Sequence, residues 1–393
     1  MTLIIIVVGT VIAVCALPGT VELLLLTIAG LFPPRRSGTR NSGTLRLAVV
    51  VPAHNEELNI ARCVASLYAS DRAGTDLSVF VIADNCTDGT NRAAAEAGAT
   101  VLVRRNAQEK GKGYALDFAF RALLPGSYDA FVVVDADSEV TPNFIREMAG
   151  AFRSGAQAAQ CRYTVRNTGD SIRTRLMTVA LYGFNVLRPR GRDRLGLSAG
   201  IYGNGFALSA ETLRLVPYTA ASVVEDLEYH LALVRAGRRV RFVDKAAVYG
   251  DMPIAGEGVE TQRARWEGGR LRMIAKKAPQ LCVEILGGRW RLLEPCLDLL
   301  LLPLAFHVVL LIIAVAAPSP LSRDLGLAGI FAVLFHLIAA IRVGGGTLKD
   351  AGVLVMAPLY MIWKILLVPR LLRTSRSGAA WVRTERAPQE KIL

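Results

Sequence analysis

The amino-acid sequence predicts an α/β fold, with a doubly wound and mostly parallel sheet flanked by transmembrane helices. Between residues 45 and 165, apolar runs of strand length alternate with helix-like segments, which is the pattern of parallel sheets covered by helices on both faces. These runs end in polar, turn-forming residues, at the place where open α/β sheets bind ligands. Apolar segments long enough to cross a bilayer lie near both ends of the chain.

Residues 1–32 are predicted to form the first transmembrane helix. Residues 3–32 contain a single acidic residue, Glu22, and no basic residue. A cleavable secretory signal would place basic residues before its apolar stretch, and Thr2–Ile6 contains none. We therefore expect an uncleaved membrane helix.

The charge distribution favours a membrane protein over a nucleic-acid-binding protein. The chain has 46 basic and 33 acidic residues, a net charge of +13. Basic residues gather beside the apolar segments, as they do on the cytoplasmic side of membrane proteins; they are Arg35, Arg36, Arg40, Arg46, Arg270, Arg272, Lys276, Lys277, Arg289 and Arg291. We expect a multi-pass protein of the cell (plasma) membrane, with its middle domain in the cytoplasm, the lipid bilayer as a partner and no nucleic acid.

Two strand-like runs each lead into a polar turn at the start of a helix. Leu45–Pro52 continues into Pro52-Ala-His-Asn-Glu-Glu57, and we expect Glu56 and Glu57 to lie in the first turn of a helix. Leu77–Ala83 continues into Asp84-Asn-Cys-Thr-Asp88. Each turn has two interpretations, a ligand site or a well-capped helix start.

The next two strands end in a basic loop and in a pair of carboxylates. Thr100–Val103 precedes a flexible loop in which Lys112 opens the helix Tyr114–Leu124. Val132–Val134 ends in Asp135 and Asp137, which could share Mg²⁺ or Mn²⁺ through oxygen ligands or form an acidic turn. The carboxyl ends of parallel strands meet at one edge of a sheet, so we expect these residues to converge with Asp84 and Asp88.

Two common nucleotide-binding motifs are absent from the sequence. A dinucleotide-binding fold needs Gly-x-Gly-x-x-Gly after its first strand, and Pro52–Glu57 contains no glycine. A P-loop needs Gly-Lys-Ser/Thr, and Lys112 is followed by Gly113. The six cysteines form no Cys-x-x-Cys pair, which leaves no indication of a zinc site or a disulfide framework.

The second half of the middle domain is less regular. We predict a strand over Gln157–Val165, a helix over Ile172–Leu187 and a strand pair formed by Arg238–Val243 and Ala246–Gly250. Glu225 and Asp226 would lie in the first turn of a helix, either as a general base or as helix-capping acids.

A third polar group follows the strand pair. Gln262, Arg265 and Trp266 are spaced i, i+3 and i+4, so they share one face of a predicted helix. The amide of Gln262, the guanidinium of Arg265 and the ring of Trp266 are groups that can bind a pyrophosphate leaving group and a sugar. The alternative is a surface arginine beside a core tryptophan.

In this order, the motifs resemble those of the membrane-bound family 2 glycosyltransferases, such as cellulose, chitin and hyaluronan synthases and ceramide glucosyltransferases. The resemblance covers about residues 46–280, and Gln-x-x-Arg-Trp is its most diagnostic motif. It implies a GT-A fold for the cytoplasmic catalytic domain. Together with the apolar runs and the charge distribution, it leads us to expect five parts in the chain. These parts are a transmembrane helix (1–32), a cytoplasmic catalytic domain (45–269), an interfacial amphipathic segment (270–291), membrane helices (292–369) and a basic tail (370–393).

The resemblance also implies roles for individual residues. The residues expected to contact the nucleotide sugar are Pro52, Asn55, Glu56, Glu57, Asp84, Asp88, Lys112 and Asp135. Asp135 and Asp137 would bind the divalent cation, and Asp226 would be the base, with Glu225 beside it. Gln262, Arg265 and Trp266 would line the acceptor and diphosphate end.

The implied function is inverting transfer of a sugar from a nucleotide sugar, by resemblance a UDP-sugar, to a lipid or saccharide acceptor at the membrane. One alternative is a processive polysaccharide synthase that exports its polymer. Another is a non-catalytic membrane scaffold or transporter with a degenerate nucleotide domain, although the motif set here is complete.

The last apolar runs leave the topology open. They are Leu292–Ala317, Leu325–Ile341 and Ala351–Val368. Lys364 lies deep in the third run, where a charge is costly in lipid. We expect Ala351–Val368 to lie along the interface or to re-enter the membrane.

Overall fold

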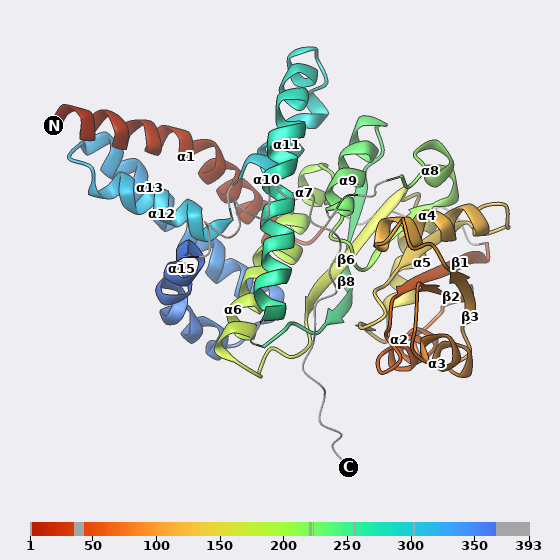
Figure 1. The fold of residues 1–393 in the computed structure, drawn as a ribbon. Coiled ribbons are helices and arrows are strands. Elements are labelled where there is room, and N and C mark those ends of the chain that lie inside the picture. The colour runs from red at the N-terminus through yellow and green to blue at the C-terminus, as the bar shows by residue number, and fades with distance from the viewer. Residues whose placement is uncertain are drawn as a thin grey trace. The chain divides into compact units, whose positions relative to one another are not determined.

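The structure is a computed structural model that describes residues 2–34, 43–219, 222, 224–254, 257–301 and 303–366, with the backbone alone for residues 2 and 257–266. The chain forms two compact units (Figure 1). We call Met1–Phe32, Gly169–Leu195 and Pro253–Leu393 the helical unit, and Pro33–Thr168 and Gly196–Met252 the sheet unit. Gly169–Leu195, which the sequence placed inside the catalytic domain, therefore packs with the helices that follow that domain.

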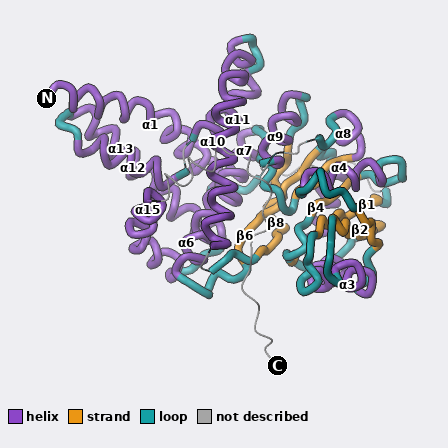
Figure 2. The backbone as a smooth tube through the Cα atoms, in the orientation of Figure 1, coloured by secondary structure: helices purple, strands orange, loops and turns teal. Residues whose placement is uncertain are grey.

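The sheet unit contains one mixed, mostly parallel sheet of order β3-β2-β1-β4-β7-β6-β8-β5. Figure 2 shows its strands in orange. Strands β1 to β4 run parallel to one another, β8 is parallel to β6, and β7 is antiparallel to both β4 and β6. The short strand β5 lies antiparallel to β8. The strands are β1 (Leu45–Ala53), β2 (Thr75–Asp84), β3 (Thr100–Arg104), β4 (Ala130–Val133), β5 (Glu139–Val140), β6 (Ala158–Val165), β7 (Phe206–Ser209) and β8 (Val240–Gly250). The predicted α/β class is confirmed.

Helices pack on both faces of this sheet, so the side chains of β1 are buried on both sides. Val49 and Val51 belong to a core formed with helices α2 and α5, whereas Ala48 and Val50 belong to a second core formed with α4 and α9. The helices of the unit are α2 (Ile60–Tyr68), α3 (Thr90–Glu96), α4 (Lys112–Leu123), α5 (Phe144–Arg153), α8 (Ala210–Leu215) and α9 (Glu225–Arg235). Burial on both faces explains the continuous apolar runs in the sequence.

The structure corrects three boundaries. The predicted strand pair Arg238–Val243 and Ala246–Gly250 is the single strand β8, whose register against β6 shifts between Cys161 and Arg162. Such a bulge absorbs extra residues without ending a strand. Glu56 and Glu57 lie in the turn before α2, which begins at Ile60, and not in its first turn.

The third correction concerns the predicted helix Ile172–Leu187 in the helical unit. An α-helix, α6 (Ile172–Leu181), passes into the π-helix η1 (Tyr182–Leu187) and then into α7 (Arg188–Leu195). The other elements of this unit are α1 (Thr2–Gly30), α10 (Glu257–Leu286), η2 (Trp290–Leu292), α11 (Leu293–Leu300), α12 (Leu304–Ala316), α13 (Pro320–Gly344), α14 (Leu348–Gly352), η3 (Val353–Met356) and α15 (Ala357–Leu366).

Two helices in the described part of the chain are long and apolar enough to cross a membrane, Leu3–Gly30 and Pro320–Gly344. A third span is possible if Trp290–Leu300 and Leu304–Ala316, which meet at an angle of 79°, form one broken span. Helix α1 packs against both α12 and α13 (Figure 1).

The last predicted apolar run, Ala351–Val368, is not one long helix where the structure describes it. Its described residues form the end of α14, the short 3-10 helix η3 and α15. Lys364 lies on α15 and pairs with Glu267 on α10, which accounts for a charge in an apolar run. The predicted basic tail 370–393 lies outside the described residues.

Candidate active site

The loops that follow β1 and β2 are joined by hydrogen bonds. Asn55 has a positive φ of 56°, and its Oδ1 accepts a hydrogen bond from the Thr87 amide at 2.8 Å. The Glu57 carboxylate accepts from the Gly89 amide at 3.0 Å, and the Glu57 amide donates to Asp88 Oδ2 at 3.2 Å. Asparagine tolerates the left-handed backbone conformation that this turn requires. Asn55, Glu57 and Asp88 thus fix the shape of the two loops.

Pro52 and Glu56 belong to the same arrangement. Pro52 lies near the end of β1, in register with Ile82 of β2. The Glu56 amide donates to Thr90 Oγ1 at 2.8 Å, and His54 Nδ1 forms a hydrogen bond with the Asp84 carbonyl at 2.7 Å. The loops at the ends of the neighbouring strands β1 and β2 therefore lie together.

Asp84 ends β2 and is paired with Arg104, a residue that sequence reasoning missed. Arg104 Nη1 donates to Asp84 Oδ1 at 2.8 Å, and Arg104 Nη2 lies 3.0 Å from Glu109 Oε2. Strands β2 and β3 place the two residues directly opposite each other. The sequence does show a basic residue at the end of the third predicted strand, but its pairing with Asp84 could be predicted only from the register of the two strands.

The two carboxylates after β4 lie beside a lysine. Lys112 Nζ forms a short hydrogen-bonded ion pair with Asp135 Oδ1 and donates to the Gly203 carbonyl at 2.7 Å. The Asp137 carboxylate accepts from Ser138 Oγ at 3.1 Å. No group of three or more His, Cys, Asp or Glu residues that could bind a metal occurs among the described residues. Two carboxylates fit a cation whose other ligands are water and phosphate oxygens.

The Gly203-Asn-Gly205 turn brings this pair close to Asp226. Gly203 has a φ of +77°, and a Cβ atom built on it would lie 3.5 Å from Asp226 Oδ2 and 3.9 Å from Lys112 Nζ. Asn204, which sequence reasoning did not single out, accepts from the Asp135 amide at 3.0 Å and donates to Ser138 Oγ at 2.8 Å. Asp135, Lys112 and Asp226 therefore border one small space.

Burial and neighbouring charges shift the acidity of this group. Burial, and then the charge of Asp226, raise the pKa of Glu225 to about 7. Burial also raises the pKa of Asp226. Burial acts to lower the pKa of Lys112, but the Asp135 and Glu225 carboxylates outweigh it and raise that pKa. Both acids lie in the first turn of α9, as predicted, and a carboxyl group that titrates near neutral pH is suited to act as a base.

Gln262, Arg265 and Trp266 lie within helix α10 of the helical unit, which confirms that this motif is helical. Their side chains lie outside the part of the chain that the structure describes. The roles assigned to them by resemblance stay predictions.

Comparison with known proteins identifies the family. A family model described as "Glycosyltransferase like family 2" matches residues 45–269. The chain belongs to this family. The probable glycosyltransferase YdaM of Bacillus subtilis is 24% identical over 59% of this chain and 56% of that protein. The β-monoglucosyldiacylglycerol synthase of Nostoc sp. is 25% identical over 61% of this chain and 53% of that protein.

This family 2 protein thus spans about half the length of these two curated relatives. Among solved structures, it is similar to the mannosyltransferase PcManGT from Pyrobaculum calidifontis in complex with GDP-Man and Mn²⁺. The TM-score is 0.47 at 18% identity, with 93% of this chain and 97% of that chain covered.

Proposed function

We propose that this family 2 protein transfers a sugar from a nucleotide diphosphate sugar to a membrane-associated acceptor, with inversion at the anomeric carbon. The observation that supports this most is the meeting of Asp135, Lys112 and Asp226 around Gly203. Displacement of a diphosphate needs three kinds of group. They are an acid that binds a cation, a positively charged hydrogen-bond donor, and a carboxylate with a raised pKa that can act as a base.

The donor binds at the carboxyl ends of the parallel strands. Asp135 and Asp137 would hold Mg²⁺ or Mn²⁺, since two carboxylates at a strand end fit a cation that prefers oxygen ligands. The bound cation supplies charge neutralisation for the departing diphosphate. Lys112 adds a second positive charge next to Asp135. The loop formed by Pro52–Glu57 and the side chains of Asp84 and Asp88 contact the base and ribose, by resemblance those of a UDP-sugar.

The acceptor is activated by Asp226. Its carboxylate removes the proton of an acceptor hydroxyl, whose oxygen forms a bond to the anomeric carbon as the bond from that carbon to the diphosphate breaks. Attack from the face opposite the diphosphate inverts the configuration in one step. Glu225 lies beside Asp226, whose charge helps to raise the pKa of Glu225. Gln262, Arg265 and Trp266 serve the acceptor and diphosphate end by resemblance.

We propose a lipid or a lipid-linked saccharide as the acceptor. The diacylglycerol named for the Nostoc relative supports a lipid, as do the helices Leu3–Gly30 and Pro320–Gly344 of this chain. Those helices anchor a multi-pass protein in the cell membrane, with its catalytic domain in the cytoplasm. Protease treatment of sealed cells would digest the sheet unit only if this orientation were wrong.

The test uses the detergent-solubilised full chain with lipid extract, labelled nucleotide sugars and Mn²⁺ or Mg²⁺, and Asp226→Asn as the control. Label in the organic phase that disappears in the control supports single addition to a lipid. Label in a high-mass aqueous product would indicate the processive synthase instead. If the wild type neither transfers sugar nor hydrolyses any donor, the chain is a non-catalytic scaffold or transporter. Donor hydrolysis that Asp137→Ala abolishes would exclude that alternative.

A further inference from the structure

Helix α10 is attached to other helices of its unit by two ionic contacts, directly after the Gln262-Arg-Ala-Arg-Trp266 segment. The first joins Glu267 on α10 to Lys364 on α15, with Oε1 and Nζ 2.7 Å apart. The side chains of Glu267 and Lys364 are only 15% and 11% exposed. The Lys364 ammonium also lies 5.7 Å from the centroid of the Phe306 ring on α12. A buried pair of this kind is weakly screened by solvent.

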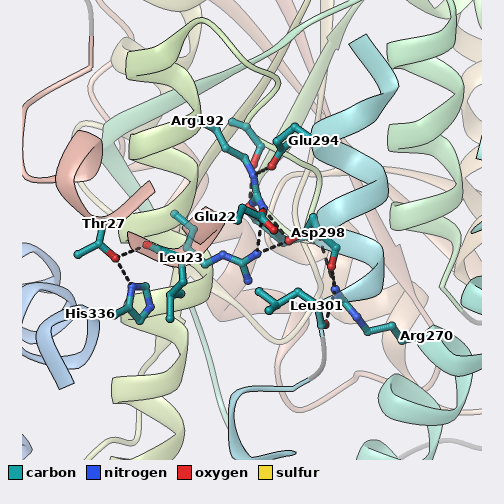
Figure 3. Close-up of polar contacts among 12 residues, drawn as sticks. Glu22, Leu23, Thr27, Arg192, Arg270, Glu294, Asp298, Leu301 and His336 are labelled. Carbon is teal, nitrogen blue, oxygen red and sulfur yellow. Dashed lines mark hydrogen bonds and ion pairs between the residues drawn. The ribbon is translucent and has the colours of Figure 1, made fainter. Parts of the chain in front are cut away.

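The second contact lies one helical turn further along α10. Arg270 donates to the carbonyl oxygen of Asp298 and lies 3.3 Å from that of Leu301, at the carboxyl end of α11 (Figure 3). The last carbonyl groups of a helix lack partners within the helix and favour a positive charge. Arg270 therefore caps α11 from α10.

Asp298 connects this cap to the first membrane helix. Its carboxylate pairs with Arg188 and, at 2.6 Å, with Arg192 of α7. Glu22 of α1 lies 3.5 Å from Arg188. It also lies 3.6 Å from Arg192, and Figure 3 shows these two side chains together. The charged members of this cluster balance; they are Arg188, Arg192 and Arg270 against Glu22, Glu294 and Asp298. The contacts run without interruption from α10 through α11 and α7 to α1.

Packing helices through buried ionic contacts is less favourable in free energy than packing them through apolar contacts. Burying two charges costs free energy that their attraction often fails to recover, and apolar side chains would pack the same helices at lower cost. Ion pairs instead specify orientation, because each pair fixes the rotation of a helix about its axis and its position along that axis. Glu267 and Arg270 are spaced i, i+3, so they share one face of α10 and set both quantities.

We propose that Glu267 and Arg270 are positioning residues, which orient the Gln262–Trp266 segment by attaching α10 to Lys364 and Asp298. This inference rests on the proposed function of that segment in binding the acceptor and the diphosphate. The segment ends one residue before Glu267 on the same continuous helix, so a rotation of α10 at Glu267 turns the whole segment. A displacement of about 1 Å at a reacting centre can lower a rate about 10²-fold.

The test is a charge exchange in the full-length protein. Glu267→Lys and Lys364→Glu each place two like charges together, and the double variant restores an opposite pair. The neutral variants Glu267→Gln and Lys364→Met remove the pair without repulsion, in case the reversals do not fold. Glu284→Lys is the matched control, since it reverses a charge on the same helix, away from Glu267 and Arg270, and breaks a pair with the exposed Arg289.

Two readouts are needed. Amide hydrogen exchange of residues 257–266 reports the attachment of the helix directly. Transfer kinetics report its consequence: we expect kcat/KM for the acceptor to fall about tenfold or more in the single variants and to recover in the double variant. Affinity for the free nucleoside, which lacks the diphosphate, should change less than about twofold, because the loops after β1 and β2 that are proposed to contact the base and ribose are untouched.

The outcomes separate this proposal from the proposed function. Faster exchange in the single variants, with protection regained in the double variant, supports the attachment of α10 whether or not the wild type transfers sugar. Absence of sugar transfer in the wild type would refute only the proposed function. Exchange as slow in the single and neutral variants as in wild type overturns the proposal. So does faster exchange with an unchanged kcat/KM, since the attachment would then be structural only.

Discussion

Arg104 and Asp84 form a buried ion pair across the neighbouring strands β2 and β3, with Nη1 and Oδ1 2.8 Å apart and side chains only 7% and 8% exposed. Asn85 Nδ2 donates to the same oxygen at 3.0 Å. The pair fixes the Asp84 carboxylate in one orientation at the end of the strand, so a predicted nucleotide contact is preorganised before any ligand binds.

Replacing Arg104 with Met should weaken both folding and nucleotide binding. The change leaves the Asp84 carboxylate buried without its cation, which typically costs about 3–5 kcal/mol. Chemical denaturation and calorimetric titration with UDP would measure the two effects. Arg92→Met is the control, because its pair with Glu57 is largely exposed and should contribute about 1 kcal/mol or less. Equal losses in the two variants would contradict the prediction.

The rate of sugar transfer should rise with pH around neutrality. A general base acts only when deprotonated, and burial raises the pKa of Asp226. The neighbouring Glu225, whose pKa burial raises to about 7, gains its negative charge around neutrality and then makes Asp226 a stronger base. Glu225→Gln removes one negative charge beside Asp226, so the rise in kcat/KM should move to lower pH. An unchanged pH profile in this variant would show that the pair does not control the rate.

The same raised pKa predicts how stability depends on pH. The folded state favours neutral Glu225, so the stabilisation is fully present below the ordinary pKa of 4.5 and is lost as the pH rises through about 7. Glu225→Gln should therefore gain thermal stability relative to wild type at pH 8 and show little gain at pH 4. Melting curves at the two pH values would measure the difference, and a gain of equal size at both would argue against a buried neutral acid.

Two glycines of one turn should respond differently to alanine. Gly203 and Gly205 both have positive φ, +77° and +69°, so alanine is strained at either position by about 1–2 kcal/mol. A Cβ on Gly203 would face Asp226 and Lys112, whereas one on Gly205 would collide with Cys161 Sγ and with Val248 Cγ2 at 2.8 Å. Gly205→Ala should lose more stability, and Gly203→Ala more activity per folded molecule. A common pattern in both variants would exclude a special role for Gly203.

Within the ionic cluster of the helical unit, Asp298 should matter more than Glu22. Asp298 pairs with both Arg188 and Arg192, so Asp298→Asn leaves two buried cations short of a counter-charge, at about 3–5 kcal/mol. Both Glu22 oxygens are buried without a hydrogen bond among the described residues, and their ion pairs are longer. Glu22→Gln should therefore cost about 1 kcal/mol. Detergent-induced unfolding of the two variants would test this order.

The sequence alone determined where the strands of the parallel half lie and where polar residues follow them. Val49 to Val51 had to be apolar at successive positions because both faces of β1 are covered. Parallel strands end at one edge of the sheet, so the sequence also placed Asp135 and Lys112 at the same edge. Local patterns were sufficient for these features because each depends on neighbours in the chain.

Only the tertiary structure decided which charged groups meet. Arg104 faces Asp84 because of the register of two strands, and Glu22 approaches Arg188 because α1 packs on α7, although the two residues are far apart in the sequence. Lys364 looked misplaced in an apolar run until its partner Glu267 was seen. Pairing across a fold depends on packing geometry, which no local pattern of residues contains.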